Sequence, residues 1–218
     1  MTEQDSSPFD QLTREALYPL LNNLYWVHLD IVDVCSRWVP RRERSDERVW
    51  LATQLQREAA EVPMYLGMIE ALGLAPDVSY RINDSLVRYA RLKETDDEIE
   101  VLVGMNVLAQ AVLGYIEHRA LYRFDPVFFA QFAETIAFDA GAWERARIAM
   151  QRRDPERLRG QLAAHRQHMF DFTIPELKPL LAPVVAAGVF PPEIIEIGIE
   201  RYSEVSLELG VELHDVAV

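Results

Sequence analysis

Two carboxylates, Glu58 and Glu61, are the first residues of this chain to consider for chemistry. They are three residues apart, so both side chains leave one face of an α-helix. Two acids that lie close together in an apolar pocket divide their proton affinities, so that one can donate a proton while the other accepts one. Such a pair can perform acid–base chemistry without a metal ion. The structural alternative is that they are hydrated or paired with Arg57, Arg119 or Arg145, because burying an unpaired acid is costly.

A metal-binding pattern common in helical bundles is missing from the sequence. Carboxylate-type metal helices carry a Glu and, three residues later, a His, because both side chains then reach one metal. No histidine of this chain follows a Glu at that spacing: His28, His118, His165, His168 and His214 follow Tyr25, Tyr115, Leu162, His165 and Val211. The pattern His165-x-x-His168-x-x-Asp171 puts its histidines on one face, with the Asp about 120° further round. The sequence leaves open whether this is a metal site or a polar face near a loop.

Helices must position all of these residues. Apolar residues recur at the helical period almost throughout, and no stretch alternates as a strand does. We therefore expect an all-α fold, a four-helix bundle with two additional C-terminal helices. Proline, glycine and capping signals place the helices at about 13–38, 45–72, a third region that reaches 122 and is broken near 95–97, 125–152, 154 to just before Pro175, and 192–210.

Composition limits the classes of function. The 218 residues are 50% hydrophobic, enough for one substantial core, and we expect a single domain over 1–218 with residues 1–10 disordered. The net charge of −13 disfavours binding to nucleic acid or to an anionic membrane, because both partners are themselves negative. The single Cys35 excludes an intrachain disulfide and a cysteine-rich zinc site. With no apolar N-terminal run, a soluble cytoplasmic protein is expected.

Several segments resemble the ferritin-like di-iron proteins, and among them the soluble acyl carrier protein desaturases. Residues 136–143, Ile-Ala-Phe-Asp-Ala-Gly-Ala-Trp, are similar to the fourth-helix motif I-A-x-D-E-x-R-H of that family. Residues 58–61, Glu-Ala-Ala-Glu, resemble its second-helix E-x-R-H, and Gln110-Ala111 before His118 resembles its third-helix Q-E. Shorter likenesses at 23–24, 170–175 and 187–190 follow the family's order along the chain. The resemblance implies a ferritin-like four-helix bundle.

The same resemblance implies that most metal ligands of the family are replaced. Its second-helix Glu falls on Glu58, and the His of that helix falls on Glu61. The remaining positions fall on Ala111, Ala140 and Trp143, which have no suitable donor, and, on the first helix, on Val27 or, with a one-residue slip, on His28 or Trp26. At most two or three oxygen or nitrogen ligands therefore survive. A methyl group and an indole offer a metal no basic lone pair. An ordinary di-iron oxygenase or desaturase is therefore disfavoured, and we expect neither a metal nor another cofactor.

The main functional hypothesis is a metal-independent enzyme on a desaturase-like scaffold. The resemblance points Glu58 and Glu61 toward the bundle interior, with His28 on the facing first helix as the third catalytic group. The expected reaction is an isomerisation, dehydration or cyclisation of a hydrophobic small molecule, which a carrier protein could deliver. Its pocket would be lined by five aromatic residues that otherwise serve as core packing, namely Trp26, Tyr65, Tyr115, Phe138 and Trp143.

Two alternatives stay open at this point. The first is a non-catalytic ferritin-like subunit that partners a di-iron oxygenase, for which the interior should be filled and an outer face broadly apolar. The second is a di-iron enzyme with unorthodox ligands. A homodimer is expected in either case. An arginine cluster at the first interhelical turn could dock a carrier protein or could simply be solvated, and it comprises Arg37, Arg41, Arg42, Arg44 and Arg48.

Overall fold

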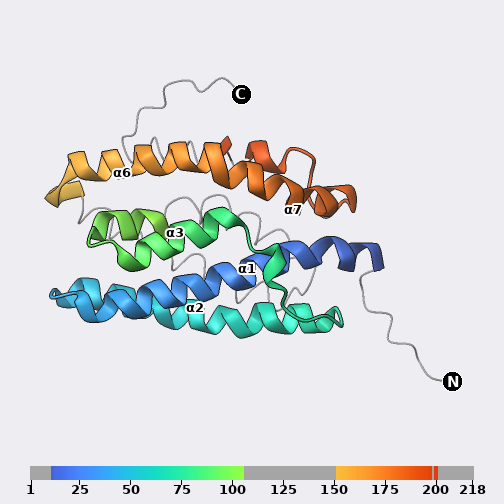
Figure 1. Ribbon diagram of the computed structural model, residues 1–218, viewed down its shortest axis with the longest axis horizontal. Helices are drawn as coiled ribbons and strands as arrows, with labels where there is room; N and C mark the ends of the chain where they lie inside the picture. Colours follow the sequence, from blue (N-terminus) through green and yellow to red (C-terminus); the bar gives the residue numbers. More distant parts are fainter. Residues whose placement is uncertain (1–10, 106–150, 198, 201–218) are drawn as a thin grey trace.

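A computed structural model of the chain describes residues 11–105, 151–197 and 199–200, and every regular element in these ranges is helical (Figure 1). The all-α prediction is therefore confirmed for the described part of the chain. The main helices are α1 (Gln11–Trp38), α2 (Ser45–Ala71), α3 (Asn83–Glu94), α6 (Pro155–His168) and α7 (Ile174–Ala186). Three short helical turns join them, namely η1 (Val39–Arg41), η2 (Val78–Tyr80) and η3 (Met169–Thr173).

The first two helices form a long antiparallel pair (Figure 1). The turn η1 contains Pro40, which has no backbone N–H and therefore ends α1 where the sequence predicts. Trp38 fixes this end of the pair, because its buried indole Nε1 donates to the carbonyl of Leu92 at 2.8 Å. The α2 helix begins at Ser45, but its N-cap is Arg44 and no side chain caps it there.

Polar side chains of α1 hold the connection between α2 and α3 against the pair. Asn22 accepts a hydrogen bond from the backbone N–H of Asp77 at 2.6 Å, and Asn23 accepts one from the N–H of Ile82 at 3.3 Å. Tyr18 donates its hydroxyl hydrogen to the carbonyl of Ala75 at 2.6 Å. These bonds satisfy loop groups that a turn alone would leave open. They fix the start of α3 next to the middle of α1.

The third helical region is interrupted where the sequence predicts. The α3 helix ends at Glu94, Thr95 is extended, and residues 98–105 are helical again. Asp97 starts this second segment, because its carboxylate accepts hydrogen bonds from the N–H groups of Ile99 and Glu100 at 2.9 and 3.2 Å. Residues 106–150 lie outside the described part of the chain. They include the predicted continuation of this helix to 122 and all but the last two residues of the predicted helix over 125–152.

The C-terminal rod differs from the prediction. Asp154 caps α6 as expected, by accepting from the N–H of Arg157 at 3.1 Å. The helix was expected to end before Pro175, but it continues through the π-helical turn η3 into α7. Because a proline ring clashes with the carbonyl four residues earlier in an α-helix, a widened turn just before Pro175 lets the rod continue. The α7 helix was not among the predicted helices; it ends at Ala186, two residues before Gly188, which has a positive φ of 68°.

Buried apolar side chains form two clusters along α1. One joins α1 to α2, α6 and α7 through residues such as Leu24, Tyr65 and Leu181. The other joins α1 to α2, α3 and residues 98–105 through residues such as Val34, Tyr89 and Met105. Within the described ranges, no helix combines the length and the apolar character that crossing a membrane requires.

Candidate acid–base site

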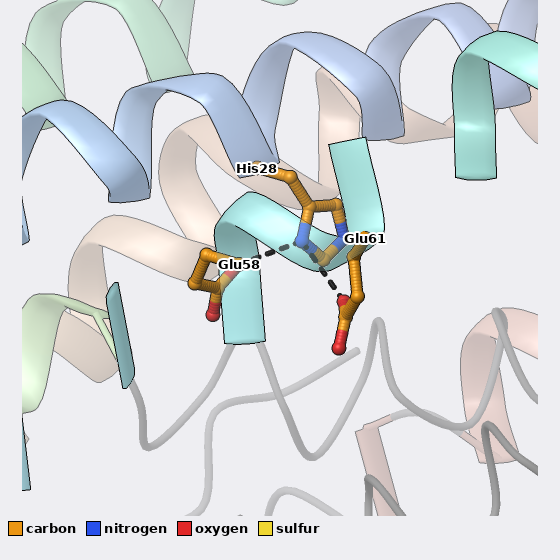
Figure 2. Close-up of side chains that lie close together, drawn as sticks. All are labelled: His28, Glu58 and Glu61. Carbon is orange, nitrogen blue, oxygen red and sulfur yellow. Dashed lines mark hydrogen bonds and ion pairs between the residues drawn. The ribbon is translucent and has the colours of Figure 1, made fainter. Parts of the chain in front are cut away.

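The structure brings three predicted site residues into direct contact. His28 projects from α1 toward α2, where Glu58 and Glu61 lie one turn apart on the facing side (Figure 2). The Nδ1 atom of His28 is 2.7 Å from Oε2 of Glu58 and 3.1 Å from Oε2 of Glu61. One imidazole nitrogen is thus shared by two carboxylates. The helical spacing of the acids and the antiparallel pairing of α1 with α2 together produce this arrangement.

All three side chains are buried. His28, Glu58 and Glu61 expose only 6%, 5% and 9% of their surface. The second oxygen of Glu58 accepts a hydrogen bond from the amide of Gln54, one turn earlier on α2. The imidazole of His28 stacks on the ring of Tyr65, with 4.7 Å between centroids and 26° between planes. Glu58 and His28 are therefore each held by a second group, which fixes their orientation.

The charges of the cluster balance without an added ion. Arg57 lies near enough to sense both acids: partial burial lowers the pKa of its guanidinium, while Glu61 and then Glu58 oppose that change. An arginine remains protonated in proteins, so Arg57 contributes one positive charge. If both carboxylates are ionised and His28 is protonated, the charges of these three groups and Arg57 sum to zero. Buried charges persist only when they are paired, and this set pairs them.

The same three side chains also fit a metal ion by donor type. One donor atom from each residue lies within 4.8 Å of the others, and no other group of this kind occurs in the described part of the chain. Imidazole and carboxylate donors suit zinc, iron or manganese. With a divalent ion, a neutral His28 and Arg57, however, the total would be one positive charge in a buried site. The balance of charge therefore favours a proton over a metal in this position.

The surroundings of the cluster are low in polarity. Cys35, fully buried on α1, contacts the sulfur of Met105 at 3.8 Å. Burial raises the pKa of the Cys35 thiol far above its ordinary value, and the negative charge of Glu58 raises it further. Burial also raises the pKa of Tyr89 to about 12, with Arg88 opposing the change and Glu58 adding to it. Neither group supplies a nucleophile at neutral pH.

The predicted aromatic residues are placed unevenly. Tyr65 is buried against His28, as a residue lining the site would be. Trp26 is two residues from His28, so the two side chains leave α1 about 200° apart. Its indole Nε1 donates to the carbonyl of Asp77 at 3.2 Å instead. Tyr115, Phe138 and Trp143 lie outside the described residues, so their predicted binding roles stay predictions.

The histidine pattern of α6 does not gather into one site. His168 binds Asp84 of α3, Asp171 accepts from Gln167 at 2.9 Å, and the ring nitrogens of His165 are shielded from water. Burial lowers the pKa of His165 to about 3, and the positive charges of Arg88 and His168 lower it as well. The polar-face alternative therefore fits these residues better than a metal site.

The arginine cluster at the first turn is largely engaged within the molecule. Arg42 and Arg153 both bind Glu98, and Arg37 binds Glu94 at 3.1 Å. Arg48 donates to the carbonyl of Arg42. Arg37 and Arg42 are thus paired with acids of the same chain, which reduces the charge available to a carrier protein. Docking at this turn stays a prediction.

Sequence reasoning did not identify Gln54 or the environment provided by Cys35 as parts of this site. Gln54 is four residues before Glu58 and therefore on the same face of α2, a spacing that could have indicated the contact. Comparison of the chain with models of protein families, with curated proteins and with solved structures found no match. The site must therefore be interpreted from its own geometry.

Proposed function

We propose that His28, Glu58 and Glu61 are the proton-transfer groups of a metal-independent enzyme built on a ferritin-like helical bundle. The observation that carries the proposal is the sharing of one buried imidazole nitrogen by two buried carboxylates. Unequal neighbours are what separate the proton affinities of two nearby acids. A purely structural ion pair would need only one of the two acids.

The distances suggest different roles for the two acids. A hydrogen on Nδ1 of His28 can be donated fully to only one acceptor, and Glu58 is the nearer at 2.7 Å. Glu58 is also held by Gln54, so we assign it the task of orienting His28. Glu61 makes the longer contact at 3.1 Å and is the more exposed acid, so we assign it the proton exchange with substrate.

The reaction class follows from what such groups can do. An isomerisation moves a proton between two positions of one molecule, and a dehydration or a cyclisation adds only acid–base steps to this. None of these needs an oxidant or a reductant, and the enzyme regains its starting protonation after each turnover. The aromatic ring of Tyr65 beside His28 favours an apolar substrate.

A metal centre is the second candidate, and the spacing of the three donor atoms favours it. His28, Glu58 and Glu61 would hold the ion, which would supply a Lewis acid or an activated water. The two candidates differ in what occupies the space beside Nδ1 of His28. The balance of charge with Arg57 is the reason we place the metal second.

The proposed function can be tested without knowing the substrate. An apolar extract of the source cells is incubated with the protein in D₂O, and mass spectrometry identifies molecules that gain deuterium. We expect labelling by the wild type and by Glu70→Gln, an exposed glutamate on the same helix, but none by Glu61→Gln or Glu58→Gln. If all four proteins give equal deuterium labelling, or if none gives any, the result opposes the proposal and favours a non-catalytic subunit.

A further inference from the structure

The rod formed by α6 and α7 contains one turn that an uninterrupted α-helix would not have. Residues Met169–Thr173 are π-helical, and the N–H of Ile174 donates to the carbonyl of Met169, five residues earlier. A π turn has poorer hydrogen-bond geometry than an α turn and is rare, so other contacts must stabilise it. Pro175 makes a widened turn tolerable, but it does not fix where the extra residue is held.

One buried carboxylate on α3 contacts both ends of this turn. Asp84, whose side chain has no exposed surface, binds Nε2 of His168 through Oδ1. Its Oδ2 accepts the hydroxyl hydrogen of Thr173 at 2.6 Å. The backbone N–H of Asp84 also donates to Glu176, in the first turn of α7, at 2.8 Å. Asp84 thus connects α3 with the residues before and after the widened turn.

The spacing of the two contacts is the decisive point. His168 and Thr173 are five residues apart, so in a continuous α-helix their side chains would point about 140° away from each other. In a π turn, residue i bonds to residue i+5, and residues at this spacing lie nearly above one another. Asp84 can therefore hold His168 and Thr173 together only while the segment is π-helical.

We propose that Asp84 is a register lock that selects between two rotational settings of α7. With the lock closed, Leu177, Leu181 and Val184 face the core. If the segment changed to an α-helix, at the cost of bringing the Pro175 ring against the carbonyl of Asp171, the extra residue would be absorbed, and every later residue would turn by about 100°, one helical position. Leu181 would then leave the core, and Pro183, now exposed, would turn to the orientation of Val184.

Further contacts hold Asp84 and α3 in place around this lock. Arg88, one turn later on α3, lies 3.9 Å from Oδ2 of Asp84 and donates to the carbonyl of Gly104 at 3.4 Å. Gly104 also lies close to α3, because a Cβ atom there would be 2.8 Å from the side chain of Leu92. The α3 helix is therefore in contact with residues 98–105 as well as with the rod.

Thiol labelling can detect the change of register. One cysteine is added to the chain, either in place of Leu181 or in place of Pro183, and the native Cys35 is kept. Each protein is made with and without Asp84→Asn, and the rate at which a thiol reagent modifies each cysteine is measured. Opening the lock should raise the rate at 181 at least about tenfold and lower the rate at 183. General unfolding would raise both, and it would also expose the native Cys35, which is buried in the other cluster and reports on that state.

A milder variant guards against loss of the fold. Thr173→Val keeps the shape of the side chain and removes only the hydroxyl contact with Asp84. We expect the same opposite changes at 181 and 183 at smaller amplitude, with Cys35 still protected. Rates at both positions that stay unchanged in Asp84→Asn, or that rise together with that of Cys35 in both variants, would overturn the proposal.

Discussion

Replacing His28 by phenylalanine tests the charge balance of the site in the folded protein. The new ring can still stack on Tyr65, but it offers no nitrogen to the two acids that now lie 2.7 and 3.1 Å from Nδ1. Removing one partner from a buried ionic group leaves the others without compensation and typically costs about 3–5 kcal/mol. We expect His28→Phe to lower the free energy of unfolding at pH 7 by that amount.

Removing the two acids together with the histidine should recover most of this lost stability. A triple variant, His28→Phe with Glu58→Met and Glu61→Met, removes both acids and leaves only Arg57, which is partly exposed; replacing the buried members of an ionic group by apolar residues is often neutral. Its stability should lie within about 2 kcal/mol of the wild type. The assay is urea denaturation at pH 7 and again near pH 4, where carboxyl groups protonate and the penalty of the single variant should shrink. A single variant as stable as the wild type, or a triple variant as unstable as the single one, would refute the reasoning.

Two further predictions concern pH. Asp97→Ala should cost about 1 kcal/mol at pH 7, measured by urea denaturation, because the start of the helix at 98 loses its cap. Burial acts to raise the pKa of Asp97, but the N–H groups of Glu100 and Ile99 and the side chain of Arg157 outweigh it, so the pKa is lowered. The stabilisation by Asp97 is therefore present above the unfolded-state pKa near 3.8 and is lost as the pH falls through the folded-state pKa. If Asp97→Ala still lowers the stability by the same amount at pH 2, this prediction is wrong. For His165 the folded pKa of about 3 lies below the ordinary value of 6.5, so below pH 6.5 the unfolded chain takes up a proton that the native one does not. Stability should fall by up to about 1.4 kcal/mol per pH unit below 6.5 in the wild type, and less steeply in His165→Phe; equal slopes for the two proteins would show that His165 accepts a proton when folded.

The sequence predicted most of the local structure, because the signals there are local. Pro40 at the end of α1 and Asp154 before α6 act through local chemistry, and the structure has both boundaries where they were expected. Pro175 gave the wrong result for a related reason. A proline shows that an ordinary α-helix cannot continue, but it does not show that a π turn can carry the rod past it, and the contact of that turn with Asp84 joins residues about ninety positions apart.

The candidate site was predictable in part. The three-residue spacing of Glu58 and Glu61 places both acids on one face, and the resemblance to ferritin-like proteins turned that face toward His28. The sharing of a single nitrogen by both acids depends on how closely α1 and α2 pack, which no spacing within one helix specifies. The position of Trp26 depends on a loop carbonyl, and that contact also lies beyond any local pattern.

The central claim is that a proton, and no metal ion, lies between His28 and the two acids. Elemental analysis of protein purified without chelator, then incubated with Fe²⁺, Zn²⁺ and Mn²⁺ and desalted, tests this most directly. We predict metal far below one equivalent per chain, with the same trace amount in wild type and in Glu58→Gln. One or more equivalents in the wild type that disappear in Glu58→Gln and Glu61→Gln would contradict the account and establish a metal centre.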